Sequence, residues 1–144
     1  RAAGASAANG VERVLARRFA GRPQRALETA GSQLALFDGL SAPDQRRLLV
    51  LAITDRDGYA RTLAAWSAGN VAAMARSNDR LFAGAPAMHA ALLTDRNIRW
   101  SRWIARRMRM PGKVLVAVGA GHLAGRESVV AMLRRAGLSV RRVQ

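Results

Sequence analysis

The strongest restriction on the fold comes from a short apolar run, Val114–Val118, which a glycine-rich turn and a histidine follow. The run is too short for a typical helix and is apolar on both faces, which is typical of a central strand covered on both sides. The next segment, Gly125–Ala136, is amphipathic with helical spacing, and alternation over 138–143 predicts a last strand. A strand, a helix and a strand within about thirty residues predict a βαβ unit with parallel strands and a right-handed crossover.

Most of the remaining sequence has helical periodicity, and one more strand is predicted at Gln24–Thr29. Ser41 is a predicted N-cap because Asp44 follows three residues later, and Asn70 can cap a further helix after the break at Gly69. The predicted fold class is therefore α/β, helix-rich and α+β-like: a small mixed or parallel sheet with a C-terminal strand–helix–strand unit, packed by several helices. The predicted helices span 11–19, 34–37, 41–55, 59–69, 70–77, 87–108 and 125–136.

The chain of 144 residues is long enough for a single domain with its own core. It does not begin with methionine, and the small, polar residues 1–10 are typical of a linker, so residues 1–144 are expected to be a single domain or a fragment of a longer protein. No apolar run is long enough to cross a bilayer. Cysteine is absent, so any metal would have to use imidazole and oxygen ligands.

The net charge of +15 has two interpretations. It could be a surface for nucleic acid or another polyanion, or it could reflect an arginine-rich composition with solvated helix faces. The arginines are spread along the chain and most lie opposite an apolar stripe, which favours the second interpretation and predicts no nucleic-acid partner. Exposed edges of the predicted sheet could promote homo-oligomerisation.

His122 is the first candidate functional residue, because ligands of open α/β sheets bind at the carboxyl ends of the strands. Gly119 and Gly121 would permit backbone angles and close approaches that other residues block. A neutral imidazole there could bind a metal or act as a general base, and the alternative is an ordinary exposed loop histidine. His89, on a mainly apolar helical segment, is interpreted as structural or exposed.

Arg96 and Glu28 are the next candidates. Arg96 falls on or beside the apolar stripe of its helix, where a guanidinium needs an anionic partner unless it reaches solvent. Glu28 closes the predicted short strand and could face the same sheet edge as His122, although it could also be an acid near the start of the next helix.

Four groups of residues stand in a recognisable order along the chain: Leu27–Thr29 with Gln33 and Phe37, Trp66 with Gly69, Leu92–Asn97, and Val116–Leu123 with Gly125. With the closing strand–helix–strand pattern, they make the whole chain resemble the carboxy-terminal half of the TraB/GumN family. The resemblance implies a superfamily that includes the Tiki proteases, which look like divalent-metal-dependent hydrolases. The pattern of that superfamily gathers two Gly-x-x-His motifs with acidic, Arg and Asn residues in one cleft.

By this resemblance, Gly119 and His122 form the second Gly-x-x-His motif, Glu28 is the strand-end glutamate, and Arg96–Asn97 are the Arg-Asn pair. The implied catalytic set is then Glu28, Arg96, Asn97 and His122. His122 and Glu28 are the implied ligands of a divalent metal ion, and Gly119 and Gly121 would line the bound group.

The first Gly-x-x-His motif is absent from the sequence, so the chain is expected to carry half a metal site and to be inactive without the missing half. The complete protein is then expected to be a metal-dependent, peptidase-like hydrolase acting on a peptide or small polymer. The alternative is a binding or regulatory module that holds a peptide signal or a polysaccharide without turnover. The resemblance also favours an extracytoplasmic or membrane-associated parent protein.

Overall fold

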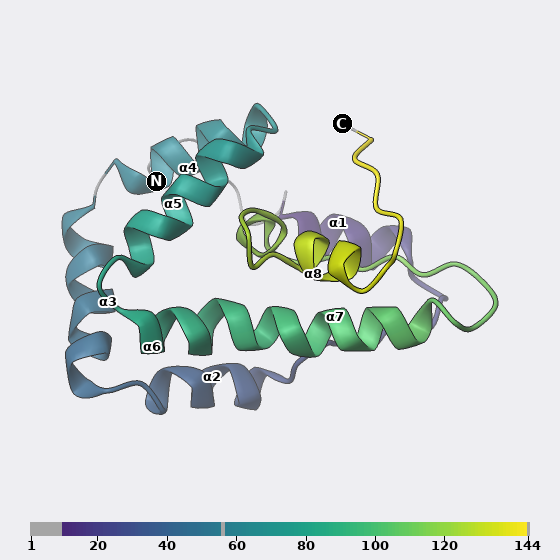
Figure 1. The fold of residues 1–144 in the computed structure, drawn as a ribbon, viewed down its shortest axis with the longest axis horizontal. Helices are drawn as coiled ribbons and strands as arrows, with labels where there is room; N and C mark the ends of the chain where they lie inside the picture. The colour runs from purple at the N-terminus through teal and green to yellow at the C-terminus, as the bar shows by residue number, and fades with distance from the viewer. Residues whose placement is uncertain (1–9, 56, 144) are drawn as a thin grey trace.

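The computed structural model describes residues 10–55 and 57–143, and within these ranges the fold is all-α (Figure 1). The predicted α/β class is wrong, because 64% of the described residues are helical and none of them forms a strand or sheet. The helices are α1 (Val11–Arg18), α2 (Ala30–Asp38), α3 (Ala42–Thr54), α4 (Gly58–Ser67), α5 (Val71–Phe82), α6 (Pro86–His89), the π-helical η3 (Ala90–Thr94), α7 (Asp95–Arg107), the 3-10 turn η4 (Ala120–Leu123) and α8 (Val129–Arg135).

The two segments predicted to be the strands of a βαβ unit flank α8, but no backbone hydrogen bond between them is found in the described part of the chain. Val118 and Val140 instead pack side by side with α7 and α8, in the cluster around Trp100. Leu115 is 57% exposed, so the run is not covered on both sides. β-branched residues favour extended backbone, but a sheet also needs a partner strand, and here Val118 and Val140 are partly covered by helices instead.

The strand predicted at Gln24–Thr29 is also wrong. Thr29 is instead the N-cap of α2, since its Oγ1 accepts a hydrogen bond from the backbone N–H of Ser32 at 3.0 Å. Glu28 therefore precedes a helix rather than closing a strand, which agrees with the alternative interpretation of this residue.

The predicted caps of two other helices are confirmed. Ser41 caps α3 by accepting the N–H of Asp44, and Asn70 caps α5 by accepting the N–H of Ala73. The last helix is shorter than predicted, because Ser128 caps it by accepting the N–H of Ala131. Helix α8 therefore starts at Val129.

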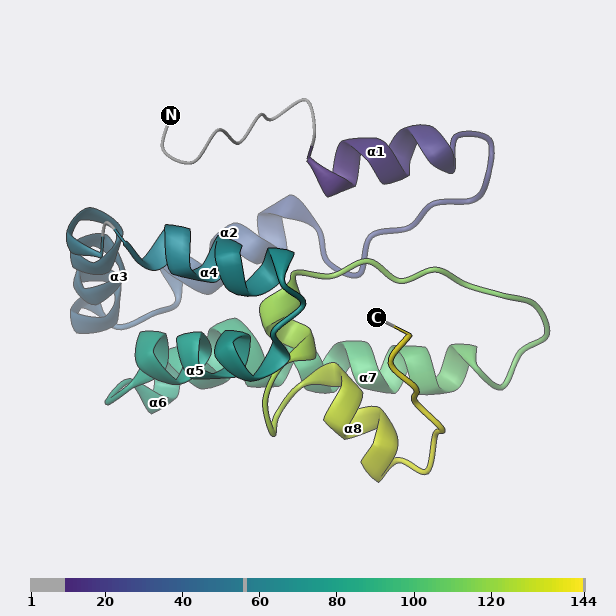
Figure 2. The ribbon, with the colours of Figure 1, turned by 90° about the horizontal axis from the view of Figure 1, so that it is seen from above.

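The central element is a rod made of α6, η3 and α7, which follow one another without a break (Figure 1). Helix α2 runs along one side of this rod, and α8 packs against α7 on another side (Figures 1 and 2). Helix α4 packs on α5, and α5 contacts η4, which brings the turn that carries His122 between α5 and α7. Helix α1 stands apart from α7 and α8 in Figure 2 and has no buried residue.

Three small apolar clusters form the core, each where two or more helices meet. Their buried members are Leu40, Ala85 and Met88; Ala65, Met74 and Ala124; and Trp100, Val129 and Leu133. The second cluster includes Ala120 and Ala124 on the turn that carries His122, and the ring of Trp100, from the third cluster, contacts His122 itself. Both clusters therefore hold this turn. A helix with the length and apolarity to span a membrane is not found among the described residues.

Candidate functional site

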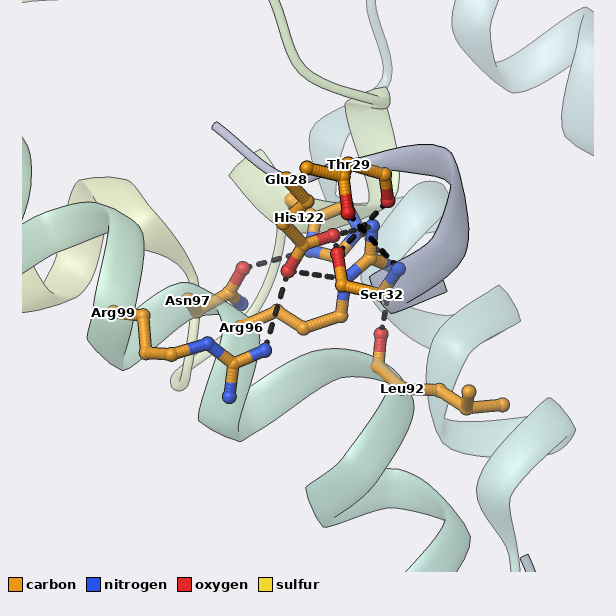
Figure 3. Close-up of polar contacts among 8 residues, drawn as sticks. All are labelled: Glu28, Thr29, Ser32, Leu92, Arg96, Asn97, Arg99 and His122. Atoms are coloured by element: carbon orange, nitrogen blue, oxygen red, sulfur yellow. Dashed lines mark hydrogen bonds and ion pairs between the residues drawn. The ribbon is translucent and has the colours of Figure 1, made fainter. Parts of the chain in front are cut away.

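A π-helical turn precedes the residues of the candidate site. In η3 the N–H of Asp95 donates to the carbonyl of Ala90, five residues earlier, so the helix widens directly before Arg96 and Asn97. Such turns inside α-helices are frequent at functional sites. The carbonyl of Leu92, in the same turn, accepts a hydrogen bond from Nη1 of Arg96 at 3.2 Å (Figure 3). The widened turn thus contributes an acceptor that positions the guanidinium.

Arg96 points inward and pairs with Glu28 from the start of α2 (Figure 3). Its Nε lies 3.0 Å and 3.2 Å from the two carboxylate oxygens, and its Nη2 lies 2.9 Å from Oε2. The side chain of Glu28 is only 7% exposed, and Arg99, one turn further along α7, donates to Oε1 at 3.2 Å. The carboxylate is therefore buried but satisfied by two guanidinium groups, the arrangement that a buried charge requires.

His122 lies on the other side of Arg96, and its ring is fixed by two partners. Nδ1 is 2.7 Å from Oδ1 of Asn97, and Nε2 is 3.4 Å from Nη1 of Arg96. A guanidinium can only donate, so Nε2 is the acceptor and Nδ1 carries the proton that is donated to Asn97. The amide of Asn97 cannot turn around, because its Nδ2 donates to the carbonyl of Glu127 at 2.7 Å. These contacts select one tautomer of the imidazole.

The indole of Trp100 packs against both His122 and Arg96. Its ring is 4.5 Å from the ring of His122, between centroids, and the guanidinium carbon of Arg96 lies 4.8 Å from the indole. The ring is buried and belongs to the cluster with Val129 and Leu133. It therefore excludes water from one face of the site and attracts the cation of Arg96 through its π-system.

The site perturbs two pKa values. Burial and the positive charge of Arg96 lower the pKa of His122 from 6.5 to about 4, and the charge of Glu28 opposes them only partly. Burial by itself raises the pKa of Glu28, but the hydrogen bonds and charge of Arg96, with the hydrogen bond from Arg99, outweigh it and lower that pKa below 4.5. At neutral pH the site therefore holds a neutral imidazole, a carboxylate and a guanidinium.

The four residues named from sequence as a catalytic set thus lie in one hydrogen-bonded chain: Glu28 to Arg96, Arg96 to His122 and His122 to Asn97 (Figure 3). The two glycines of the turn have different roles. Gly121 lies so close to Asn78 that an added Cβ would be 3.1 Å from Oδ1 of that residue, whose Nδ2 donates to the Gly121 carbonyl. Gly119 has an ordinary φ of −56°, so its predicted conformational freedom is not used here.

A sequence model of the TraB/PrgY/gumN family matches residues 1–142. The chain belongs to this family. A search of curated proteins gives no match, and a search of solved structures gives none either. The resemblance found from the Gly-x-x-His and Arg-Asn motifs is therefore confirmed at the level of the family.

Glu28 and His122, the metal ligands that the resemblance to the TraB family implies, face the same guanidinium. An ion bound by both would have to replace Arg96 or stand beside its positive charge, which disfavours a second cation. The described residues also contain no group of three or more His, Cys, Asp and Glu side chains placed to hold an ion. On their own, these residues therefore do not fit a divalent metal.

Three residues that support the site in this family member were not identified from sequence. Arg99 and Trp100 follow Arg96 at helical spacings of three and four, the signal that could have revealed them. Glu127 had no such signal: its backbone carbonyl orients Asn97, while its carboxylate accepts from Thr94 at 2.8 Å and lies 3.5 Å from His89. Glu127 thus joins the α8 side of the site to the π-helical turn.

Proposed function

We propose that this TraB-family chain supplies the proton-transfer and charge-stabilising groups of a hydrolytic centre for peptide bonds. The proposal rests on one observation: the unprotonated Nε2 of His122 and the donor Nη1 of Arg96 are 3.4 Å apart and face each other. Hydrolysis of an amide needs a base for the attacking water and a donor for the developing oxyanion, held close together.

The proposed step begins when the substrate carbonyl enters between the two groups. Arg96 keeps its contacts with Glu28 through Nε and Nη2, and Nη1 donates to the carbonyl oxygen in place of His122. The Nε2 of His122 accepts a proton from water as the water oxygen bonds to the carbonyl carbon. The C–N bond then breaks, and the proton passes from Nε2 to the leaving amine. Asn97 stabilises the transient imidazolium by accepting from Nδ1.

A mostly apolar hollow beside the His122 turn supports a peptide with a bulky apolar side chain as the substrate. Its volume is about 300 Å³, and Ala120 and Gly121 form part of its wall. Trp66, a half-exposed aromatic residue, lines it from α4. The remaining wall residues are Tyr59, Thr62, Leu63 and Met74.

A divalent ion, which the family resemblance implies, has no part in these steps, because Arg96 occupies the space between the two ligand-type side chains. We also propose a metal-dependent version of this hydrolysis for the complete protein. In a larger assembly, further ligands would draw Glu28 or His122 away from Arg96 and bind the ion together with that residue. The two versions can be separated with a chelator, because removal of the metal ion would abolish only the metal-dependent cleavage.

The test is a cleavage assay on acetylated and amidated peptides, with products identified by mass spectrometry. It is run on residues 1–144 and on the complete gene product, each with and without a chelator. His122→Gln and Arg96→Gln are expected to abolish cleavage, and His89→Gln is the matched control because His89 lies outside the hydrogen-bonded chain. Cleavage that survives His122→Gln, or its absence from both proteins, would remove the proposal.

One observation favours a binding module as the second candidate. The Nε, Nη1 and Nη2 atoms of Arg96 all have acceptors within the protein, so the guanidinium does not need a substrate to complete its hydrogen bonds. A peptide signal or saccharide would then bind in the hollow beside Gly121 without reaction. Binding that leaves the ligand intact, and that Leu63→Arg weakens while His122→Gln does not, would establish this alternative.

A further inference from the structure

The loop that follows α7 carries a second feature that the proposed site does not use. Residues 106–115, here called the basic tip, form one end of the molecule along its longest axis in Figures 1 and 2. The sequence contains no acidic residue between Asp95 and Glu127, and the tip itself contains Arg106, Arg107, Arg109 and Lys113.

The basic tip combines these cations with exposed apolar side chains. Met108 is 58% exposed, Met110 62% and Leu115 57%. Arg106, Arg109 and Lys113 are exposed too, and none of them has a carboxylate within ion-pair distance in the described ranges. Apolar side chains surrounded by cations are typical of surfaces that bind anionic membranes.

The first part of the tip is a hydrogen-bonded turn. The N–H of Met110 donates to the carbonyl of Arg107 at 3.1 Å, and Nη1 of Arg107 donates to the carbonyl of Met110 at 3.1 Å. Gly112 has a φ of +95°, which favours glycine and turns the chain back toward Val114. Met108 and Met110 are therefore held at the end of the rod.

We propose that the basic tip binds an anionic lipid surface, with Met108, Met110 and Leu115 entering the headgroup region and Arg106, Arg109 and Lys113 contacting lipid phosphates and carboxylates. A second copy of the chain is a poor occupant, because two tips of the same charge repel each other. A nucleic acid would match the charges, but it would leave the exposed methionines and Leu115 without a role.

The proposal is tested by sedimentation of the chain with vesicles of phosphatidylcholine alone and of phosphatidylcholine with an equal part of phosphatidylserine. Binding is expected only to the mixed vesicles. Met108→Ser with Met110→Ser should lower the partition coefficient by roughly tenfold or more, since two exposed apolar side chains no longer enter the lipid. Arg106→Gln, Arg109→Gln and Lys113→Gln together should lower it by on the order of a hundredfold.

Matched controls come from other exposed surfaces. Leu49→Ser with Ile53→Ser removes apolar side chains from α3, and Arg13→Gln, Arg17→Gln and Arg18→Gln remove three charges from α1. Both controls should bind as the unchanged chain does. Absence of binding, or equal losses in the controls, would overturn the proposal. Binding that depends on the tip cations but not on the methionines would also overturn it, because the apolar side chains would then not enter the lipid.

Discussion

The Oδ1 atom of Asn97 lies 2.7 Å from Nδ1 of His122, and this contact decides which nitrogen of the imidazole faces Arg96. Asn97 is completely buried, and its Nδ2 is held by the carbonyl of Glu127. The orientation of His122 therefore depends on a residue that need not touch a substrate, as is common for ring nitrogens at functional sites.

Asn97→Ala should lower the free energy of unfolding by about 2–3 kcal/mol, because it leaves the Glu127 carbonyl and Nδ1 of His122 without their partner. Urea denaturation measures this loss. Asn70→Ala is the control: it removes an N-cap from α5 and should cost about 1 kcal/mol. If Asn97→Ala costs no more than Asn70→Ala, Asn97 does not hold the site together as described.

Arg96→Gln should raise the pKa of His122 above its value of about 4, because burial and the Arg96 charge are what lower it. Burial remains, so the pKa should stay below 6.5. Glu28→Gln should have the opposite effect and lower it further, since the Glu28 charge raises it.

These shifts are measured from the pH dependence of the imidazole proton resonances. The chain has only two histidines, so the His89 signal is an internal control, and circular dichroism verifies that each variant is folded. A His122 midpoint that does not move in Arg96→Gln would show that the two side chains are not in contact in solution.

The free energy of unfolding should fall as the pH is lowered from 6.5 to about 4. In this range His122 is protonated in the unfolded chain but neutral in the folded chain, because its pKa in the folded chain is about 4. The stability that this histidine contributes is therefore fully present above pH 6.5 and is lost as the pH falls. The contribution of this histidine to the slope approaches 1.4 kcal/mol per pH unit. Glu28, with its lowered pKa, loses its contribution only as the pH falls below 4.5, so the upper part of the window isolates the histidine.

His122→Gln provides the comparison for that slope, measured by urea denaturation at several pH values. The difference in unfolding free energy between the unchanged chain and the variant should vary with pH above 4.5 and become constant above 6.5. A constant difference from pH 4.5 to 7 would mean that the imidazole keeps an ordinary pKa when folded.

Arg96→Met should increase the affinity of the chain for a divalent cation such as Zn²⁺, since it removes the positive charge that faces both Glu28 and His122. Isothermal titration calorimetry measures the change. Arg99→Met is the control, because Arg99 is 53% exposed and contacts only Glu28 of these two residues. Tighter Zn²⁺ binding by the unchanged chain than by Arg96→Met would contradict the argument against a metal on these residues alone.

The residues of the candidate site could be predicted from the sequence better than the fold could. Arg96 on an apolar stripe needs an anion, His122 and Glu28 were predicted at the ends of strands, and the family resemblance placed these residues in one cleft. The strands are absent from the described residues, but Glu28 and His122 both contact Arg96. Local helix caps such as Ser41 were also predicted, because a cap depends on residues only a few positions apart.

The sheet could not be predicted correctly from the same information. Val114–Val118 favours extended backbone, but whether such a segment joins a sheet depends on distant residues that pair with it. Here Val118 packs on the cluster of Trp100 and Val129 instead. The π-helical turn was not predicted either, since residues 90–94 have the composition of an ordinary helix.

The π-helical turn also limits how this protein can tolerate changes in length. Each residue of an α-helix advances the side chains by about 100° around the axis, and the π-helical turn already accommodates one residue more than an α-helical turn. Inserting a further residue into Ala90–Thr94 would therefore rotate α6 relative to α7 by that angle. Met88, which is completely buried before the turn, and Arg96, which faces Glu28 after it, could not then both keep their directions. A longer spacing between these two positions is thus expected to be excluded, whereas loss of the one extra residue would leave an α-helical turn.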